Sequence, residues 1–295
     1  MFTRSLILFA FAIVAGVPAR VEAGCCFSTT ATTTARLATW EKGVAGLSAS
    51  YVRELGYFSS AARAVPLGAG TADQQLRFDL FGLVRVTDAL TLSLLVPLSM
   101  NARSASGIFA LGGGLGDIAV GARYDLLQFD HSNRPGLALI AGIAIPTGRA
   151  IGAAERALAV DATGRGTAIL NLGVSTEWAS EPWFVRGDLV GGIPMPTAQD
   201  GTWAWLSPTL DLTLMGGVRA HRYLFFGAIA RFGVQLPTRS QAFGYDMALG
   251  GGVALKPDPQ WAVLVNVSVS LFAPGAGMNR NAPLTASLAL RYAAW

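Results

Sequence analysis

Apolar and polar residues alternate along most of this chain, and the alternation is clearest between residues 76 and 101. In its first half the apolar positions are Leu76, Phe78, Leu80, Val84 and Val86, with Gly82 in the same series and the charged residues Arg77, Asp79 and Arg85 between them. After a short turn at Thr87-Asp88 the same alternation runs to residue 101. Successive side chains of a strand point to opposite faces, so this period predicts strands with one aliphatic and one polar face.

Twelve segments carry this pattern, and each is close to the roughly 9–11 residues of a tilted membrane strand. They cover residues 43–54, 74–86, 89–101, 114–127, 136–146, 166–178, 183–194, 204–218, 223–234, 243–255, 261–272 and 282–295. Hydrophobic residues make up 52% of the chain and charged residues 14%. The longest apolar run after the N-terminus, 137–145, is too short for a spanning helix and stops at Pro146. We therefore predict an all-β fold, a transmembrane antiparallel up-and-down β-barrel of about twelve strands.

The connections between these segments alternate in length. Those after even-numbered segments are short, and those after odd-numbered segments are mostly longer. Outer-membrane barrels have short periplasmic turns and longer outer loops, so this alternation predicts that both termini lie in the periplasm. Six aromatic residues fall near the short-turn side, as an aromatic girdle would: Tyr124, Trp178, Trp183, Tyr223, Trp261 and Tyr292. A soluble β-sandwich, the alternative, does not predict this clustering.

The N-terminus reads as an export signal. Arg4, an apolar run over residues 6–17 and small residues around position 23 predict a cleaved signal peptide over residues 1–23. Residues 24–42 then form a periplasmic N-terminal lead-in, and residues 43–295 form the barrel. Gly24-Cys25 also resembles the end of a lipoprotein signal, although Glu22 argues against lipidation. The adjacent Cys25 and Cys26 fit a vicinal disulfide or a pairing between chains, and they assign no function.

The last segment departs from the usual pattern of such barrels. Trp295 ends the chain, but Arg291 and Ala293 share its parity while Leu290 and Tyr292 do not. Either this strand contains a bulge near residues 293–294, or the assembly signal is read loosely.

Charged residues within the segments fall on the face opposite the aliphatic one. A charge that faces lipid costs roughly 2–4 kcal/mol at the midplane, so these side chains are expected to face the lumen. They are Arg77, Asp79, Arg85, Asp117, Arg123, Asp125, Glu177, Arg186, Asp188, Asp211, Arg231, Asp246 and Arg291. They would either set the polarity of a narrow channel or fill and staple the interior.

No constellation for catalysis, a metal or a cofactor is recognisable. His131 and His221 both fall in predicted turns, and there is no nucleophile motif, zinc motif or spaced cysteine pair. The net charge of +4 is small and scattered, which argues against nucleic acid as a partner. We expect no enzyme activity, no cofactor and no bound metal.

The stretch Gly114-Leu115-Gly116-Asp117-Ile118-Ala119-Val120-Gly121-Ala122-Arg123-Tyr124, followed by residues 134–138 and Ile145-Pro146-Thr147-Gly148, resembles the meta-pathway phenol-degradation family of outer-membrane proteins. The resemblance covers residues 114–148, and beyond them only the strand pattern agrees. It implies a passive outer-membrane transporter, with aromatic or other apolar small molecules as cargo, and it carries over no catalytic residues.

The sequence thus predicts a single-domain outer-membrane barrel that acts as a passive channel for small, aromatic or apolar molecules. The alternative is a non-conducting barrel with a structural or surface-interaction role. The expected partners are outer-membrane lipid, the solute and the barrel-assembly machinery. The oligomeric state, the solute's identity and any plug in the pore are left open by the residues.

Overall fold

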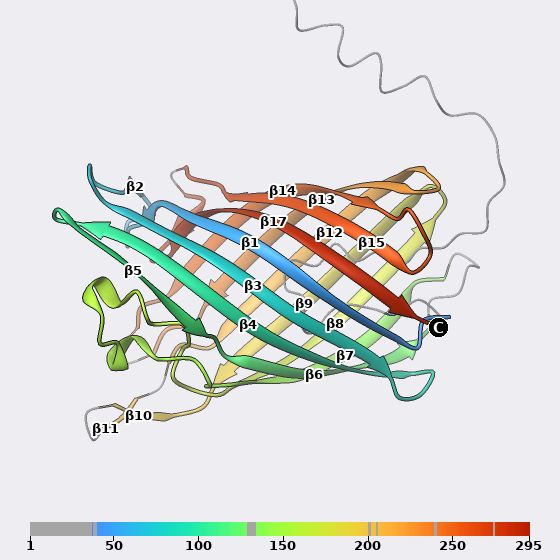
Figure 1. The fold of residues 1–295 in the computed structure, drawn as a ribbon, viewed down its shortest axis with the longest axis horizontal. Coiled ribbons are helices and arrows are strands. Elements are labelled where there is room, and N and C mark those ends of the chain that lie inside the picture. The colour runs from blue at the N-terminus through green and yellow to red at the C-terminus, as the bar shows by residue number, and fades with distance from the viewer. Residues whose placement is uncertain are drawn as a thin grey trace, which may run out of the picture.

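The chain forms a closed antiparallel barrel in the computed structural model, which describes residues 37, 40–128, 134–199, 202–204, 206–238, 241–273 and 275–295 (Figure 1). Its twelve long strands are β1 (Gly43–Phe58), β3 (Ala72–Arg85), β4 (Leu90–Ala105), β6 (Ile118–Leu127), β7 (Gly136–Ile145), β8 (Ile169–Ser180), β9 (Trp183–Pro194), β12 (Thr209–His221), β13 (Leu224–Gln235), β14 (Gly244–Leu255), β15 (Trp261–Ser270) and β17 (Asn281–Ala294). The predicted all-β barrel is confirmed. The predicted signal peptide, Cys25, Cys26 and His131 lie outside the described residues.

Each long strand pairs with its neighbours in the chain, and the first and last strands close the barrel. β1 pairs with β17 from Gly43 opposite Ala294 to Tyr57 opposite Asn281, with one bulge in β1 between Glu54 and Gly56. The strands cross the long axis of the barrel obliquely, as closure of a sheet requires (Figure 1).

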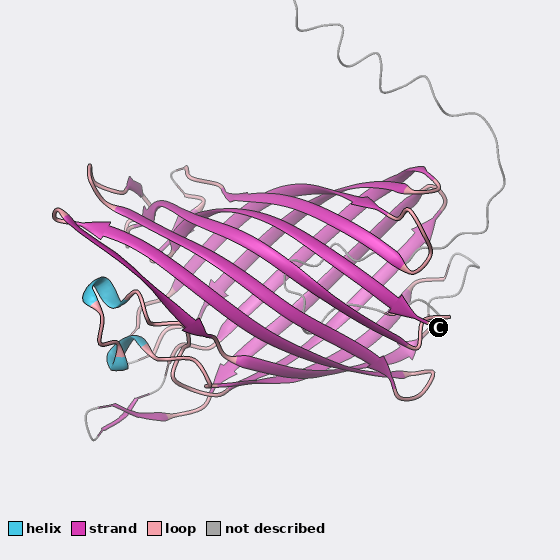
Figure 2. Cartoon of the chain, in the orientation of Figure 1, coloured by secondary structure: helices cyan, strands magenta, loops and turns pink. Residues whose placement is uncertain are grey.

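Short accessory elements gather at the end of the barrel away from the C-terminus (Figure 2). They are the strands β2 (Ala64–Pro66), β5 (Ile108–Leu115), β10 (Thr197–Gln199), β11 (Thr202–Ala204) and β16 (Gly277–Met278), and the 3₁₀ turns η1 (Ile151–Ala153) and η2 (Ala157–Ala159). In the part of the chain that is described, no helix has the length and hydrophobicity to cross a membrane.

The predicted alternation of short and long connections is confirmed. Two residues, Glu181-Pro182, join β8 to β9, and two more, Arg222-Tyr223, join β12 to β13. The opposite end carries the longer connections, of which the longest, residues 146–168 between β7 and β8, contains both 3₁₀ turns. We call the two ends the short-turn end and the long-loop end.

The prediction of one continuous strand over residues 114–127 is wrong. β4 runs on to Ala105 and turns at Ser106-Gly107, both with positive φ, and β5 returns along it. The chain then leaves the sheet at Gly116 and Asp117 before β6 begins. Period-two alternation continues through this break, which is why the sequence did not reveal it. Other boundaries shift as well: β12 begins at Thr209 rather than residue 204, β8 begins at Ile169 rather than residue 166, and β1 ends at Phe58 rather than residue 54.

The C-terminal strand contains no bulge near residues 293–294, so that alternative is wrong. β17 keeps one register with β1 from Ala294 back to Pro283. Leu290 and Tyr292 are exposed, whereas Arg291 and Ala293 are buried. Trp295 follows the end of the strand and is exposed, so its parity has no bearing on the strand's two faces.

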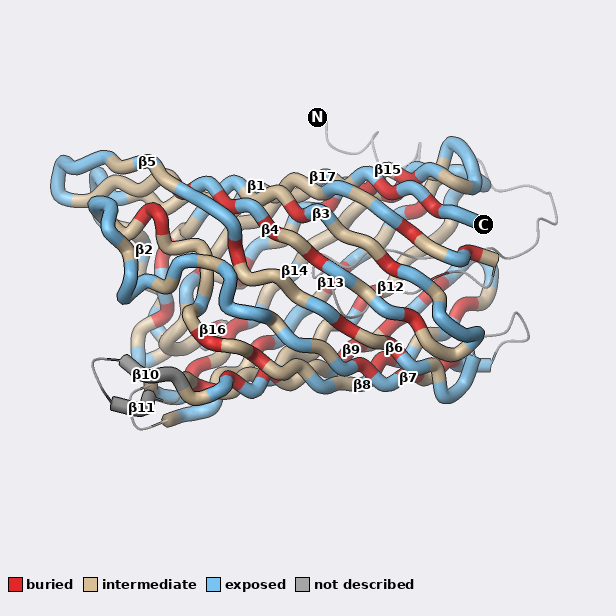
Figure 3. The backbone as a smooth tube through the Cα atoms, turned by 60° about the horizontal axis from the view of Figure 1, so that its bottom comes forward, coloured by how far each residue is buried: buried red, intermediate tan, exposed pale blue. Residues whose placement is uncertain are grey.

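Buried and exposed residues alternate along the strands (Figure 3). The exposed side chains are those of the aliphatic face; Leu80 is 59% exposed and Leu94 48%. The six aromatic residues expected in a girdle are also exposed, and Trp261 packs against Tyr292 with ring centroids 4.9 Å apart. An apolar outer surface of this kind is what a membrane-spanning barrel presents to lipid.

Candidate functional site

Most of the thirteen charged residues expected to face the lumen are held in ion pairs within the strands' buried face. Three pairs repeat one pattern, in which an arginine binds the aspartate two residues further along the same strand. These pairs are Arg77–Asp79 on β3, Arg123–Asp125 on β6 and Arg186–Asp188 on β9, at 2.6, 2.8 and 3.0 Å. Residues two apart share a face of a strand, so Arg-x-Asp places both charges side by side. The Arg-x-Asp spacing, and with it the pairing, could be read from the sequence.

The pairs on β6 and β9 belong to one cluster, which fills the interior along β6–β9. Arg123 reaches across β7 to donate to the hydroxyl of Ser175 on β8, at 3.1 Å. Glu177 stands opposite Arg186 in the ladder between β8 and β9. Arg123, Arg186 and Asp188 are each at most 4% exposed. Buried charges are tolerated only when they are paired. The charged side chains of these strands therefore depend on one another for their burial.

A second group lies across β12, β13 and β14. Arg231 binds Asp211 at 2.5 Å, and Asp246 binds Arg280, which stands just before β17. Gly233 separates the two aspartates in the ladder, and a Cβ atom there would lie 2.9 Å from one carboxylate and 3.1 Å from the other. The glycine therefore leaves room for both carboxylates. Arg280 was expected in a loop, and its role was not anticipated.

The short-turn end brings two predicted residues to the N-terminal lead-in. Arg85 donates to the backbone carbonyl of Leu37 at 3.3 Å, and Arg291 pairs with Glu41 in a contact where both side chains are about 5% exposed. Leu37 is 2% exposed and packs with Val44, Leu83 and Ala293 inside the barrel. Part of the lead-in is thus bound within the barrel end.

Asp117 is the predicted lumen residue whose position differs most from expectation, because it lies in the break between β5 and β6. Its carboxylate accepts hydrogen bonds from the backbone amides of Gly148 and Arg165, at 3.0 and 2.8 Å. Both belong to the 146–168 connection. The aspartate therefore anchors a loop and is not part of a strand.

Two further side chains, Asn101 and Asp161, hold the 146–168 connection in place. Asn101 on β4 donates to the carbonyl of Val160, which is fully buried. Asp161 accepts from the amides of Glu155 and Arg156 and from the Arg149 guanidinium. The amide of Glu155, above all, holds the pKa of Asp161 low, at about 2. The connection is thus fixed against β4 and β5 by buried polar contacts.

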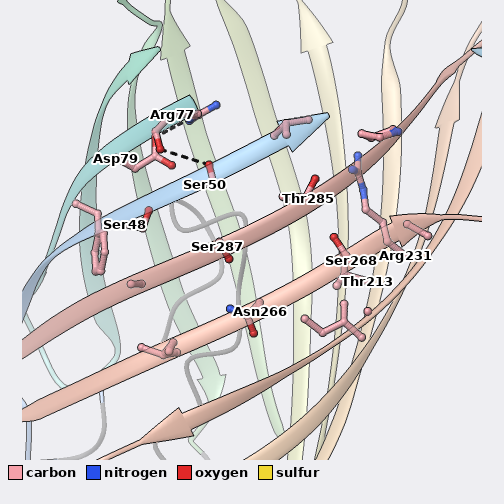
Figure 4. A pocket seen from close by; sticks show the side chains of 18 of the residues that line it. Ser48, Ser50, Arg77, Asp79, Thr213, Arg231, Asn266, Ser268, Thr285 and Ser287 are labelled. Carbon is pink, nitrogen blue, oxygen red and sulfur yellow. Dashed lines mark hydrogen bonds and ion pairs between the residues drawn. The ribbon is translucent and has the colours of Figure 1, made fainter. Parts of the chain in front are cut away.

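Along the walls formed by β1, β3 and β12–β17, the barrel encloses a cavity of about 410 Å³ (Figure 4). Five of the thirteen predicted residues line it: Arg77, Asp79, Arg231, Asp246 and Arg291. The rest of its polar lining is neutral and includes Ser48, Ser50, Thr213, Asn266, Ser268, Ser270, Thr285 and Ser287. Toward the short-turn end its lining is apolar, with Leu37, Val44, Phe81, Leu83, Ile229 and Leu264. A space of this size suits a small molecule.

The apolar residues inside the barrel were missed by sequence reasoning, which assigned the polar parity to the interior as a whole. Phe184, Met215, Phe225, Ile229 and Leu264 share that parity, and all are buried in one cluster at the short-turn end. The sequence does show that these residues share a strand face with charged ones, since Phe184, for example, lies two residues before Arg186. That they meet at one level of the barrel depends on strand register.

Among the described residues, no three His, Cys, Asp or Glu side chains are grouped so that they could hold a metal ion. His221, at the end of β12, packs its ring against Tyr223.

Comparisons with known proteins identify the fold. No family model matches the chain, and no curated protein matches it. Among solved structures, the COG4313 outer membrane channel from Pseudomonas putida F1 superposes with a TM-score of 0.71 at 12% identity, covering 86% of this chain and 96% of the channel. The β domain of the Bordetella autotransporter BrkA gives a TM-score of 0.52 at 12% identity, covering 85% and 100%. The NanC porin gives 0.50 at 9% identity, covering 84% and 98%.

These similarities show that the chain has the fold of outer-membrane β-barrels. They include a channel, a porin and an autotransporter domain, so the fold alone does not select one activity. The resemblance to the phenol-degradation family stays a prediction. What the protein does therefore depends on the residues that line its cavity.

Proposed function

We propose that this protein is an outer-membrane channel for the passive uptake of small apolar or aromatic molecules. The observation that carries the proposal is the cavity of about 410 Å³ inside the closed barrel, whose lining joins Phe81, Leu83 and Ile229 to neutral hydroxyl groups. Apolar pockets with a few polar groups are typical of small-molecule sites. The exposed aliphatic outer face supports a location in the outer membrane, after export and cleavage of residues 1–23 and insertion by the barrel-assembly machinery.

The orientation belongs to the same proposal. With the short-turn end in the periplasm, the 146–168 connection and the β4–β5 hairpin face outward. The inward charged residues of the strands then surround the solute's path. Those on β6–β9 chiefly occupy the interior of the barrel next to these strands. The cargo named by the family resemblance, aromatic compounds, is consistent with the apolar lining.

Uptake by intact cells tests this proposal with two neighbouring substitutions. Ala289 lines the cavity, and the adjacent Leu288 is exposed on the outer face. Ala289→Trp should strongly reduce the protein-dependent uptake of radiolabelled toluene by a porin-deficient host, because the indole occupies part of the cavity beside Leu264. Leu288→Trp should leave uptake unchanged, since tryptophan is tolerated on the outer surface. Equal uptake by both variants and by cells without the protein would refute the channel.

A non-conducting, surface-interaction barrel is the second candidate, and one observation favours it. The β4–β5 hairpin and the 146–168 connection carry exposed apolar side chains, with Phe109 70% and Ile151 72% exposed. Exposed apolar patches mark contact sites. Single-channel recording in planar bilayers separates the candidates, because a folded barrel that never conducts and leaves solute uptake unchanged supports the second.

A further inference from the structure

The cavity wall formed by β1, β17, β15 and β14 changes character in a single step. One inward row across these strands is mostly apolar: Ser48, Ala289, Leu264 and Ala254. The next row toward the long-loop end consists of Ser50, Ser287, Asn266 and Gly252, and the one after it of Val52, Thr285, Ser268 and Gly250. Rows on one face are separated by two residues, roughly 7 Å. An apolar surface is thus followed directly by a neutral hydrogen-bonding belt.

Asn266 is the central side chain of this belt (Figure 4). It lines the cavity and is 6% exposed, and its Oδ1 atom has no hydrogen-bond partner among the described residues. Its neighbour in the ladder toward β14 is Gly252, which has no side chain to fill the space. A buried carboxamide oxygen normally accepts a hydrogen bond, and leaving it unpaired is costly. The belt is therefore suited to a ligand that brings a donor.

Charge on the lining limits what that ligand can be. Each of the five charged residues that line the cavity is already held in an ion pair: Arg77 with Asp79, Arg231 with Asp211, Asp246 with Arg280, and Arg291 with Glu41. A ligand carboxylate or ammonium would bring an unbalanced charge into a lining whose own charges already neutralise one another. A neutral head group would not, and a hydroxyl can both donate to Oδ1 and accept from the amide.

We propose that Asn266, with Ser287 and Ser268, forms a subsite for the hydroxyl group of a neutral amphipathic molecule, whose apolar body lies against Leu264, Ala289 and Ile229. This inference rests on the proposed uptake of apolar molecules and narrows the solute class to alcohols with a small hydrocarbon body. It makes Asn266 a specificity-determining residue. A molecule of the same shape without the hydroxyl leaves Oδ1 unpaired and is bound more weakly.

Binding of two fluorinated probes of matched shape tests the subsite. 4-Fluorocyclohexanol and 1-fluoro-4-methylcyclohexane differ by a hydroxyl in place of a methyl group, and ¹⁹F NMR titrations of the protein in nanodiscs, with empty nanodiscs subtracted, give both affinities. Wild type should prefer the alcohol by about tenfold, the size of one buried hydrogen bond. Asn266→Leu should reduce the preference to about one. Asn171→Leu is the matched control, because Asn171 on β8 does not line the cavity, and it should keep the preference.

Ser287→Ala, a smaller change in the same row, should lower the preference to about threefold and serves if Asn266→Leu fails to fold. Equal binding of the two probes by wild type, or an unchanged preference in Asn266→Leu and Ser287→Ala, overturns the subsite while leaving channel function intact. Binding of neither probe also overturns it. The uptake comparison of Ala289→Trp with Leu288→Trp decides the proposed function separately.

Discussion

Replacing Arg186 with methionine should destabilise the barrel by about 3 kcal/mol, because it leaves a buried carboxylate without its partner. The Nε of Arg186 lies 3.0 Å from both oxygens of Asp188, and each side chain is 4% exposed. At an effective dielectric constant of about 20 the attraction at this distance is roughly 5–6 kcal/mol, and desolvation of the two ions offsets most of it. The intact pair is therefore nearly neutral for stability. Removing only the arginine is costly, because the buried Asp188 carboxylate then keeps its desolvation penalty without the attraction that offsets it.

Urea unfolding in lipid vesicles, followed by tryptophan fluorescence, measures this difference. The double variant Arg186→Met/Asp188→Leu should recover all but about 1 kcal/mol, because no uncompensated charge remains. Arg231→Met is the control, since the side chains of Arg231 and its partner Asp211 are 41% and 31% exposed, and it should cost no more than about 1 kcal/mol. If the double variant is as unstable as Arg186→Met, lost packing rather than the unpaired charge is the cause, and the reasoning is refuted.

Two further predictions concern the loop and the outer face. Asp161→Asn should expose the 146–168 connection to trypsin, while Glu155→Gln, which changes a side chain that is 79% exposed, should not; equal cleavage would show that the carboxylate does not anchor the loop. Because the pKa of Asp161 is held below its ordinary value of 3.8, at about 2, the wild-type loop should be fully protected above pH 4 and lose protection as the pH falls toward 2; pepsin, which is active at these pH values, replaces trypsin for this measurement. Leu80→Arg, on the outer face of β3, should cost roughly 2–4 kcal/mol in vesicles, whereas Phe109→Arg at the tip of the β4–β5 hairpin should cost less than 1. Equal costs would place both positions at one depth.

The fold could be predicted because each strand carries its own evidence. Alternation marks a strand locally, and connection lengths then fix the order and direction of the strands without any tertiary information. The break at Gly116-Asp117 escaped this reasoning for a physical reason. Asp117 leaves the sheet because its carboxylate binds amides at residues 148 and 165, and no local pattern reports a contact over that separation.

The candidate site was only partly predictable. Parity located charged side chains such as Arg231 and Asp246 on one face, and the structure brings both to the cavity. The ion-pair partners of Asp246 and Arg291 could not be predicted in this way, since Arg280 and Glu41 stand outside the regular strands. The neutral belt was not foreseen either, because Ser50, Ser287 and Asn266 are unremarkable polar residues until register aligns them.

The position of the cavity follows from side-chain size rather than from the barrel itself. Most inward residues of β7 and β14 are glycine or alanine, and a sheet lined by small residues leaves space beside it. On β7 that space is filled, because Arg123 extends across the strand to Ser175 and leaves Ala138 0% exposed. On β14, by contrast, Gly250 lines the cavity. The same closed barrel is therefore solid along one wall and hollow along the other, and the proposed solute path follows the hollow one.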